Sequence, residues 1–540
     1  MSATVAAPTR AAQPRSTRRT LAVEAAGVGA AAAVALVAVA HLSLTPRAWL
    51  LFSDPDSVLL AMMRASAAAG EPQRWALSSV LFLPERALYD ATATLGLGVR
   101  GSLAIDAVVN LVLLYAALRL VSALVRPGPR SHAVAGALAA FTAFTAFTFL
   151  DSTAAWDSLE LPSLLATTTY YSATVLATIA AAGLGAAVLA GHRRRAGGAA
   201  IALGALTAGS VLTNPLFLAW AAAPLAVVAA VLVGMRRVPL RRAGLLGAAF
   251  AAGTAVGFVL RIPFASVIVR DPGAYADPSN ALPTLAYLVH HLIARTGSAE
   301  GLVSVAAIDT VLVLDVLLLV RAIRARRTAP AVLLGLAVVT PVIVTAGTVL
   351  LGTAALRYLQ PAWFAPLLPL VLVPLPPRIL DLLRPRAPRV ALAVVLAAAG
   401  VAGAGITAAV AATPDADIRC LDAWITSSGR TGAGLFQTIR GPKALLQDPR
   451  RLLQVDRDLR AVPWLTDRAD YTVTRVSFLV ADPSNPAFST GSAGPAPRAI
   501  NCGRYRVLDW GRPVLAVLPS GPIVPPHPPS STMDGRAADR

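Results

Sequence analysis

The chain has 540 residues, of which 56% are hydrophobic and 14% are charged, and its formal net charge is +19. Its mean hydropathy of +0.65 excludes an ordinary soluble globular protein, and its length allows many membrane-spanning helices. The excess of positive charge could suggest nucleic-acid binding. The basic residues, however, gather in short clusters between apolar runs, which is typical of orientation signals in multi-pass membrane proteins. We therefore predict an integral membrane protein with membrane lipids, and no nucleic acid, as partners.

Apolar runs of roughly 15–25 residues, near the length that crosses a hydrocarbon core, recur along the chain. The first run is too long for the core of a cleavable signal peptide, so we interpret it as a membrane anchor. The predicted spans lie at 23–50, 99–125, 133–150, 171–190, 198–213, 216–234, 243–261, 301–320, 329–352, 361–377 and 389–411. The predicted fold class is therefore mainly α: a polytopic membrane protein with about eleven transmembrane helices, in a transmembrane domain that covers 21–411.

The loops between these runs alternate in charge. Arginine clusters occupy every second loop, as at Arg193–Arg195 and Arg324–Arg327, whereas the intervening loops are acidic or mixed, as in DSTAAWDSLELP at 151–162. By the positive-inside rule, the basic N-terminal tail 1–20 is predicted to be cytoplasmic. About eleven spans then place the C-terminus on the outer face of the cell membrane.

Two large segments are predicted on that outer face. The first is the loop 52–99, which contains DSVLLAMMRASAAAG. Its apolar residues have helical spacing, which predicts a helix lying on the membrane surface, and Trp75 follows as an anchor at the level of the headgroups. The second segment is the C-terminal region, which begins at residue 412.

The C-terminal region changes in composition. Helical patterns surround LDAWI and PKALLQ, the stretch 471–482 alternates like a strand, and 504–518 is typical of two strands joined at a glycine turn. We therefore predict a small exoplasmic α+β domain over 412–520. The remainder, 521–540, is rich in Pro and Ser and is predicted to be a disordered tail.

Both cysteines of the chain, Cys420 and Cys502, fall in this predicted domain. In an oxidising exoplasmic compartment they could form one disulfide that closes the domain. The alternative is a pair of buried free thiols.

The stretch LFSDPDSVLL at 51–60 places two carboxylates, Asp54 and Asp56, directly after the first apolar run. In a purely structural interpretation, one of them caps the following helix. In a functional interpretation, a carboxylate at this membrane edge takes a proton from a hydroxyl acceptor as a lipid-carried donor arrives. One carboxylate can cap while the other reacts, and we favour Asp54, which is nearer to the bilayer edge, as the base.

Taken together, the layout resembles the GT-C superfamily of membrane glycosyltransferases. The shared features are the acidic pair, the juxtamembrane helix, the many spans, an Arg-Tyr pair in LRYLQP (Arg357 and Tyr358) and the exoplasmic C-terminal domain. The segment that begins TGAGLFQTIRGPKALL is also similar to the tails of uncharacterised actinobacterial-type members. The resemblance implies an acid/base role for Asp54 and Asp56 and contact with a donor phosphate for Arg357 and Tyr358. The Asp-Pro-Asp form departs from the commoner acidic pairs, which leaves open which carboxylate is the base.

The resemblance implies a glycosyltransferase that moves a sugar from a polyprenyl-phosphate donor to a glycan, lipid or protein acceptor of the envelope, by single displacement with inversion. One alternative is a transporter or lipid flippase whose path would use Asp106, Asp309 and Asp315, since ionisable groups within spans are functional candidates. Interhelical hydrogen bonding explains these carboxyls more simply. Another alternative is a noncatalytic scaffold of envelope assembly.

The sequence calls for no particular cofactor, and a requirement for a divalent metal stays open. His290 and His291 are adjacent, so on a helix they point apart and cannot chelate one ion together. The stretch TNPLF at 213–217 contains a proline after an apolar run, and we interpret it as a tight outer turn rather than as a site.

Overall fold

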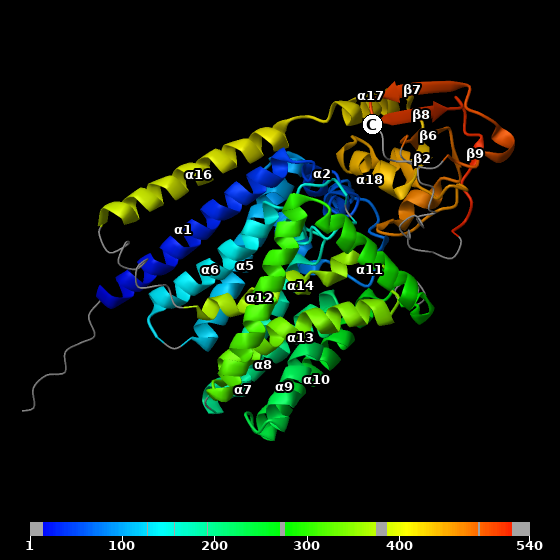
Figure 1. Ribbon diagram of the computed structural model, residues 1–540. Helices are drawn as coiled ribbons and strands as arrows, with labels where there is room; N and C mark the ends of the chain where they lie inside the picture. The colour runs from blue at the N-terminus through cyan, green and yellow to red at the C-terminus, as the bar shows by residue number, and fades with distance from the viewer. Residues whose placement is uncertain are drawn as a thin grey trace, which may run out of the picture.

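The computed structural model describes residues 15–126, 128–155, 157–191, 193–269, 276–373, 386–483 and 487–520 (Figure 1). Among these residues, nine helices are long and apolar enough to cross a membrane. They are α1 (Arg15–Leu44), α5 (Gly98–Val125), α6 (Arg130–Thr148), α7 (Ser172–Ala190), α8 (Arg193–Thr213), α10 (Leu240–Arg261), α12 (Ala299–Arg324), α13 (Thr328–Leu350) and α16 (Arg386–Ala412). The chain is a mainly helical, polytopic membrane protein.

Shorter helical pieces connect these spans. They are α2 (Ala48–Phe52), α3 (Leu59–Ala68), α4 (Leu83–Ala93), η1 (Pro162–Ala166), η2 (Leu218–Ala222), α9 (Ala223–Gly234), η3 (Ile262–Phe264), η5 (Pro278–Asn280), α11 (Ala281–Thr296), η6 (Leu356–Leu359), α14 (Pro361–Phe364) and η7 (Leu368–Leu372). The predicted span 216–234 is therefore a π-helical turn followed by α9. The predicted span 361–377 lies partly outside the described residues, and its described part is broken into α14 and η7. Prolines within this stretch remove backbone donors and interrupt the helix.

The connections between helices carry the basic clusters at one end of the helix bundle and the large loops at the other. The α9–α10 and α12–α13 connections contain Arg236–Arg242 and Arg324–Arg327. The C-terminal domain and the first loop lie beyond the opposite ends of these helices (Figure 1). The alternation seen in the sequence thus corresponds to two chemically different ends of the bundle.

The C-terminal region forms an α+β domain. Its main sheet has the order β3-β2-β6-β8-β7, in which β2 is parallel to β3 and β6, and β8 is antiparallel to β6 and β7. Its elements are α17 (Ala416–Ser428), β2 (Gly432–Gly434), α18 (Phe436–Leu445), η8 (Pro449–Arg451), β3 (Leu452–Gln454), η9 (Arg468–Thr472), β6 (Phe478–Ala481), η10 (Gly491–Ala493), β7 (Arg498–Cys502) and β8 (Tyr505–Asp509). Buried apolar side chains of α17 and α18 pack on the sheet. The two helices predicted at LDAWI and PKALLQ are both present.

The sequence locates strands near the end of the chain but not their partners. The stretch 471–482 contains β5 (Arg475–Val476) and β6 rather than one strand. The two strands expected in 504–518 are present as β8 and β9 (Leu515–Ala516), with Gly511 between them, but they do not pair with each other: β8 pairs with β6 and β7, and β9 pairs with β5. An alternation of apolar residues along one segment indicates a strand, but it does not identify the strand with which that segment pairs.

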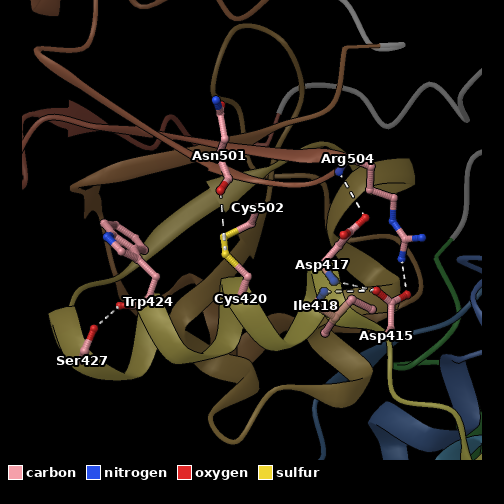
Figure 2. Close-up of a disulfide and its surroundings, with 9 residues drawn as sticks. All are labelled: Asp415, Asp417, Ile418, Cys420, Trp424, Ser427, Asn501, Cys502 and Arg504. Carbon is pink, nitrogen blue, oxygen red and sulfur yellow. Dashed lines mark hydrogen bonds and ion pairs between the residues drawn. A yellow bond between two sulfur atoms is a disulfide. The ribbon is translucent and has the colours of Figure 1, made fainter.

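A disulfide between Cys420 of α17 and Cys502 of β7 fastens the helix to the edge of the sheet, with the two Cα atoms 5.4 Å apart (Figure 2). Next to it, the Arg504 guanidinium donates to the Asp415 carboxylate at 2.5 Å, and the Arg504 backbone N–H donates to Asp417 at 3.1 Å. The start of α17, which follows directly after α16, is therefore held to the β7–β8 turn.

The first loop packs against the C-terminal domain. Its strand β1 (Trp75–Ala76) pairs antiparallel with β4 (Thr466–Asp467) of that domain. In α3, the side chains of Leu59, Met62 and Met63 are at most 4% exposed, and α18 packs against this helix. The predicted membrane-surface helix is thus present as a helix but is buried. Its apolar face has protein partners, which a single-sequence pattern cannot distinguish from lipid.

A buried network of charges holds the segment 151–171. The Arg47 guanidinium donates to the backbone carbonyl of Glu160 at 2.7 Å and to the Ser163 hydroxyl at 2.9 Å. The Arg295 guanidinium of α11 donates to the carboxylates of Glu160 at 2.8 Å and Asp151 at 3.2 Å. These opposite charges, all buried, satisfy one another and fix the chain that leads to the start of α7.

Candidate functional site

Asp54 is the buried member of the acidic pair. Its side chain is 3% exposed. One carboxylate oxygen accepts hydrogen bonds from the backbone N–H of Asp56 at 3.0 Å and of Ser57 at 2.9 Å, and the other accepts one from the Tyr170 hydroxyl at 3.2 Å. Burial, followed by the neighbouring charge of Asp56, raises the pKa of Asp54 to about 7. This carboxyl closes the turn that presents Asp56.

Asp56 is half-buried and lines a cleft of about 350 Å³ between the helix bundle and the C-terminal domain. The cleft wall also includes Arg357 and Tyr358 of LRYLQP. Its other polar and aromatic lining residues are Ser78, Ser79, Phe82, Thr169, Tyr170, Tyr171, Asn214, Trp220, Thr348, Thr353 and Trp464. The structure therefore brings three of the residues proposed from the sequence to one place, while Asp54 lies behind them.

Arg357 is oriented by aromatic residues. Its Nε–H donates to the Tyr171 hydroxyl at 3.2 Å, and the rings of Tyr171 and Tyr358 stack with centroids 5.9 Å apart. Gln360 ties this segment to the loop before α7 by donating to the Tyr170 carbonyl at 3.0 Å. Within the described ranges, no carboxylate lies within ion-pair distance of Arg357. Its guanidinium is therefore a cation available to an anion in the cleft.

Two buried polar atoms in the cleft wall lack hydrogen-bond partners in the part of the chain that the structure describes. They are the Thr169 hydroxyl and the indole N–H of Trp220, whose residues are 4% and 1% exposed. Leaving such a group unpaired costs about 1–3 kcal/mol, so buried unpaired groups in a cleft indicate where a ligand would hydrogen-bond.

One side of the cleft is apolar. Ala219 of η2, Ala223 at the start of α9, Ile343 and Val344 of α13, and Leu351 after α13 line it. Of these elements, α13 is one of the helices long and apolar enough to cross a membrane. The cleft thus has both charged and apolar lining residues.

The C-terminal domain completes the site through Arg440, which sequence reasoning missed. This α18 residue is 1% exposed. Its Nε–H donates to the Pro55 carbonyl at 2.7 Å, its Nη1 donates to the Leu465 carbonyl, and its guanidinium lies over the Phe436 ring. Pro55 precedes Asp56, and Leu465 lines the cleft. Arg440 therefore fastens the acidic turn to the cleft wall.

The sequence favours a tight outer turn rather than a site at TNPLF, yet Asn214 and Leu216 line the cleft. The Asn214 amide donates to the Thr174 hydroxyl at 2.9 Å and so joins the end of α8 to the start of α7. Proline turns after membrane spans are common, and the sequence contains no signal that this turn lines the same cleft as Trp220 and Tyr171.

The carboxyls of the alternative transport path lie on two helices, Asp106 on α5 and Asp309 and Asp315 on α12. Asp106 accepts a hydrogen bond from the Thr92 hydroxyl at 2.8 Å, and the Asn110 amide donates to the Thr167 carbonyl at 3.4 Å. On α12, Asp309 is exposed whereas Asp315 is buried. The Asp106 contact is the kind of hydrogen bond between helices that explains a polar residue within a span.

Among the described residues, no group of three or more His, Cys, Asp or Glu side chains is arranged to hold a metal ion. His290 and His291 occupy neighbouring positions of α11 with their ring planes at 81°.

Comparisons with known proteins give one structural likeness. The chain matches no protein-family model and no curated protein. It resembles the crystal structure of the Archaeoglobus fulgidus oligosaccharyltransferase tethered with an acceptor peptide, with a TM-score of 0.39 and 12% sequence identity over 83% of this chain and 68% of that chain.

Proposed function

We propose that the protein is a membrane glycosyltransferase that moves a sugar from a polyprenyl-phosphate donor to an acceptor at the outer face of the membrane. The observation that carries this proposal is the placement of a carboxylate, Asp56, and an available guanidinium, Arg357, on one cleft that also has apolar lining residues. The chemistry needs these parts: a base for the acceptor, a cation for the phosphate and an apolar path for the lipid.

The donor would bind with its phosphate on Arg357. A guanidinium offers two parallel N–H donors, which match the oxygens of a phosphate. The apolar side of the cleft, at α9 and the end of α13, would receive the first isoprene units. The rings of Tyr171, Tyr358 and Trp464 would offer flat faces to the sugar, and the unpaired Thr169 hydroxyl and Trp220 N–H would bind its oxygens.

In the transfer step, Asp56 would act as the general base. The acceptor oxygen attacks the anomeric carbon of the sugar while the bond from that carbon to the phosphate oxygen breaks. The proton of the acceptor hydroxyl passes to Asp56, and polyprenyl phosphate leaves with its negative charge on Arg357. Attack opposite to the leaving group inverts the configuration of the anomeric carbon. No other reactant is needed.

The two carboxylates would divide their roles. Asp54 is buried and accepts hydrogen bonds from Asp56, Ser57 and Tyr170, so it would hold the turn. Asp56 faces the cleft, so it would take the proton. The sequence interpretation favoured Asp54 as the base, and the geometry now favours Asp56.

The orientation of the site follows from charge. The arginine-rich connections α9–α10 and α12–α13 lie at the ends of the helices opposite to the cleft. Under the positive-inside rule these connections would be cytoplasmic, which would place the cleft, the first loop and the C-terminal domain at the outer face.

The test begins with a strain that lacks the protein. We expect a polyprenyl-phosphate sugar to accumulate there, and mass spectrometry of the lipid extract would identify it. That lipid is then incubated with the purified protein in detergent and with an envelope fraction from the same strain. In detergent there is no bilayer with two faces, so release of polyprenyl phosphate cannot result from transport, and recovery of the sugar on the envelope fraction distinguishes transfer from hydrolysis. Absence of release by the folded wild-type protein would reject the enzyme.

A further inference from the structure

Helix α11 presents an exposed apolar face that the described part of the protein leaves uncovered. Within α11, the exposed fractions are 77% for Leu282, 46% for Leu285 and Val289, 44% for Leu292 and 66% for Ile293. These residues recur at intervals of three and four, so they share one side of the helix. The single charged residue of α11, Arg295, is buried. Such a face needs an apolar partner.

Both ends of α11 are attached to the same edge of the helix bundle. Its C-terminal end is followed after Gly297 and Ser298 by α12. At its N-terminal side, the backbone N–H of Asp277 donates to the carbonyl of Leu351, the residue after α13. Because α12 and α13 form a hairpin, the start of α12 and the end of α13 lie at the same end of that hairpin. The helix therefore runs along this edge and does not cross the bundle.

The opposite face of α11 is polar and contacts the loop that supports the cleft. The Tyr287 hydroxyl donates to the Asp157 carboxylate, whose other oxygen lies 3.5 Å from Nε2 of His291. Arg295 holds Glu160 and Asp151 of the same loop. This loop continues to Tyr170 and Tyr171 in the cleft wall. The two faces of α11 thus meet different surroundings.

We infer that α11 is an interfacial helix whose apolar face (Leu282, Leu285, Val289, Leu292 and Ile293) binds the hydrocarbon edge of the membrane leaflet on the side of the cleft. The exposed apolar surface of the adjacent spans reaches this edge, at Ile262 after α10, at Leu302 and Val303 of α12 and at Leu350 of α13. The face of α11 continues this lipid-contacting surface. Lipid is therefore its occupant, rather than a second copy or another protein.

This assignment replaces the one made from the sequence. The apolar helix of the first loop, α3, is buried under α18, whereas α11 carries the open apolar face. An interfacial helix here would also connect bilayer contact with the cleft, since α11 holds the loop that carries Tyr170 and Tyr171. The inference does not depend on the proposed enzymatic activity.

The test uses single labelled cysteines in proteoliposomes. Because Cys420 and Cys502 form a disulfide in the structure, an introduced cysteine would be the free thiol available for a fluorophore. The variants are Leu285→Cys, Val289→Cys and Leu292→Cys. Two controls bracket them: Val316→Cys, on the exposed side of α12 within the span, and Asp458→Cys, on the exposed surface of the C-terminal domain.

Phosphatidylcholine vesicles would carry a nitroxide quencher at carbon 5 or at carbon 12 of the acyl chain, and iodide would be added as an aqueous quencher. We expect the three α11 labels to be quenched more by the shallow nitroxide than by the deep one, and several-fold less by iodide than the Asp458→Cys label. The Val316→Cys label should prefer the deep nitroxide. A pattern like that of Asp458→Cys would show a face in water and would overturn the inference. Protection from both iodide and nitroxide would show a protein occupant and would overturn it as well.

Discussion

Asp56 and Arg357 line the same cleft, although one lies in the first loop and the other follows α13. The first is presented by a turn that the Asp54 carboxylate closes, and the second is oriented by the Tyr171 hydroxyl. Different residues therefore position the acidic side chain and the basic side chain: Asp54 for Asp56, and Tyr171 for Arg357. This arrangement suits a reaction in which a proton is taken at one end and a phosphate leaves at the other.

Arg357 should control donor affinity. Removal of a charge-assisted hydrogen bond costs about 1.5–3 kcal/mol, so Arg357→Ala should raise the KM for the donor roughly 10–100-fold. Arg357→Lys should rescue poorly, because an ammonium cannot form the paired hydrogen bonds of a guanidinium. Initial rates of polyprenyl phosphate release over a range of donor concentrations would measure both. If Arg357 only anchors its segment at the headgroups, Arg357→Ala will leave this KM unchanged.

Arg440 should affect turnover more than donor affinity. It touches the acidic turn through the Pro55 carbonyl, so Arg440→Met should misplace Asp56 and lower kcat about 10–100-fold. The KM for the donor should change less than about twofold, since phosphate binding rests on Arg357. Arg430→Met is the matched control, because Arg430 pairs with Asp509 in the same domain but has no contact with the turn. Equal losses of kcat in both variants would reject this role.

Asp54 should make stability depend on pH in a defined direction. Burial raises the pKa of this carboxyl from 3.8, the usual value of an aspartate, to about 7. Between these values the folded protein binds a proton that the unfolded chain releases, so the contribution of Asp54 to stability falls as pH rises. Asp54→Asn removes this titration. The difference between the thermal unfolding midpoints of the variant and the wild type should therefore increase in favour of the variant as pH rises from 4.5 to 7.5. A difference that stays constant over this pH range would contradict the expectation.

Orientation can be tested without any substrate. A reporter that is active outside should work when it is fused after Pro414, between α16 and α17, and a reporter that is active inside should work when it is fused after Arg195, near the start of α8. The reason is the arginine content of alternate connections. The opposite result at either position would place the cleft on the other face and remove the proposed outer site.

The sequence contained much of the fold, because apolar runs of membrane length are a strong signal. The acidic pair and the Arg-Tyr pair also made Asp56 and Arg357 candidates from the sequence alone, and the structure places both residues on one cleft. The sequence did not indicate whether protein or lipid covers the apolar face of each helix. The burial of α3 and the exposure of α11 depend on which elements pack against them, and a hydrophobic residue that faces lipid has the same identity as one that faces protein.

The parts of the site that the sequence missed arise from distant contacts. Arg440 reaches the Pro55 carbonyl from another domain, and Asn214 lines the cleft only because α7 and α8 meet there. The difference between Asp54 and Asp56 also required the structure. Either aspartate could cap a helix or accept a proton. Only the hydrogen bond from Tyr170 to Asp54 and the direction of the turn, which places Asp56 on the cleft, distinguish the two residues.

The most direct test of the account compares Asp56→Asn with Asp54→Asn. Asparagine keeps the size of the side chain and cannot accept the proton of the acceptor, so Asp56→Asn should lower turnover by about 10²–10⁴ while leaving expression and thermal unfolding unchanged. Asp54→Asn keeps an oxygen for the turn and should retain most of the turnover. The measurement is release of polyprenyl phosphate by the two purified variants at saturating donor. Near-normal release by Asp56→Asn would contradict the account.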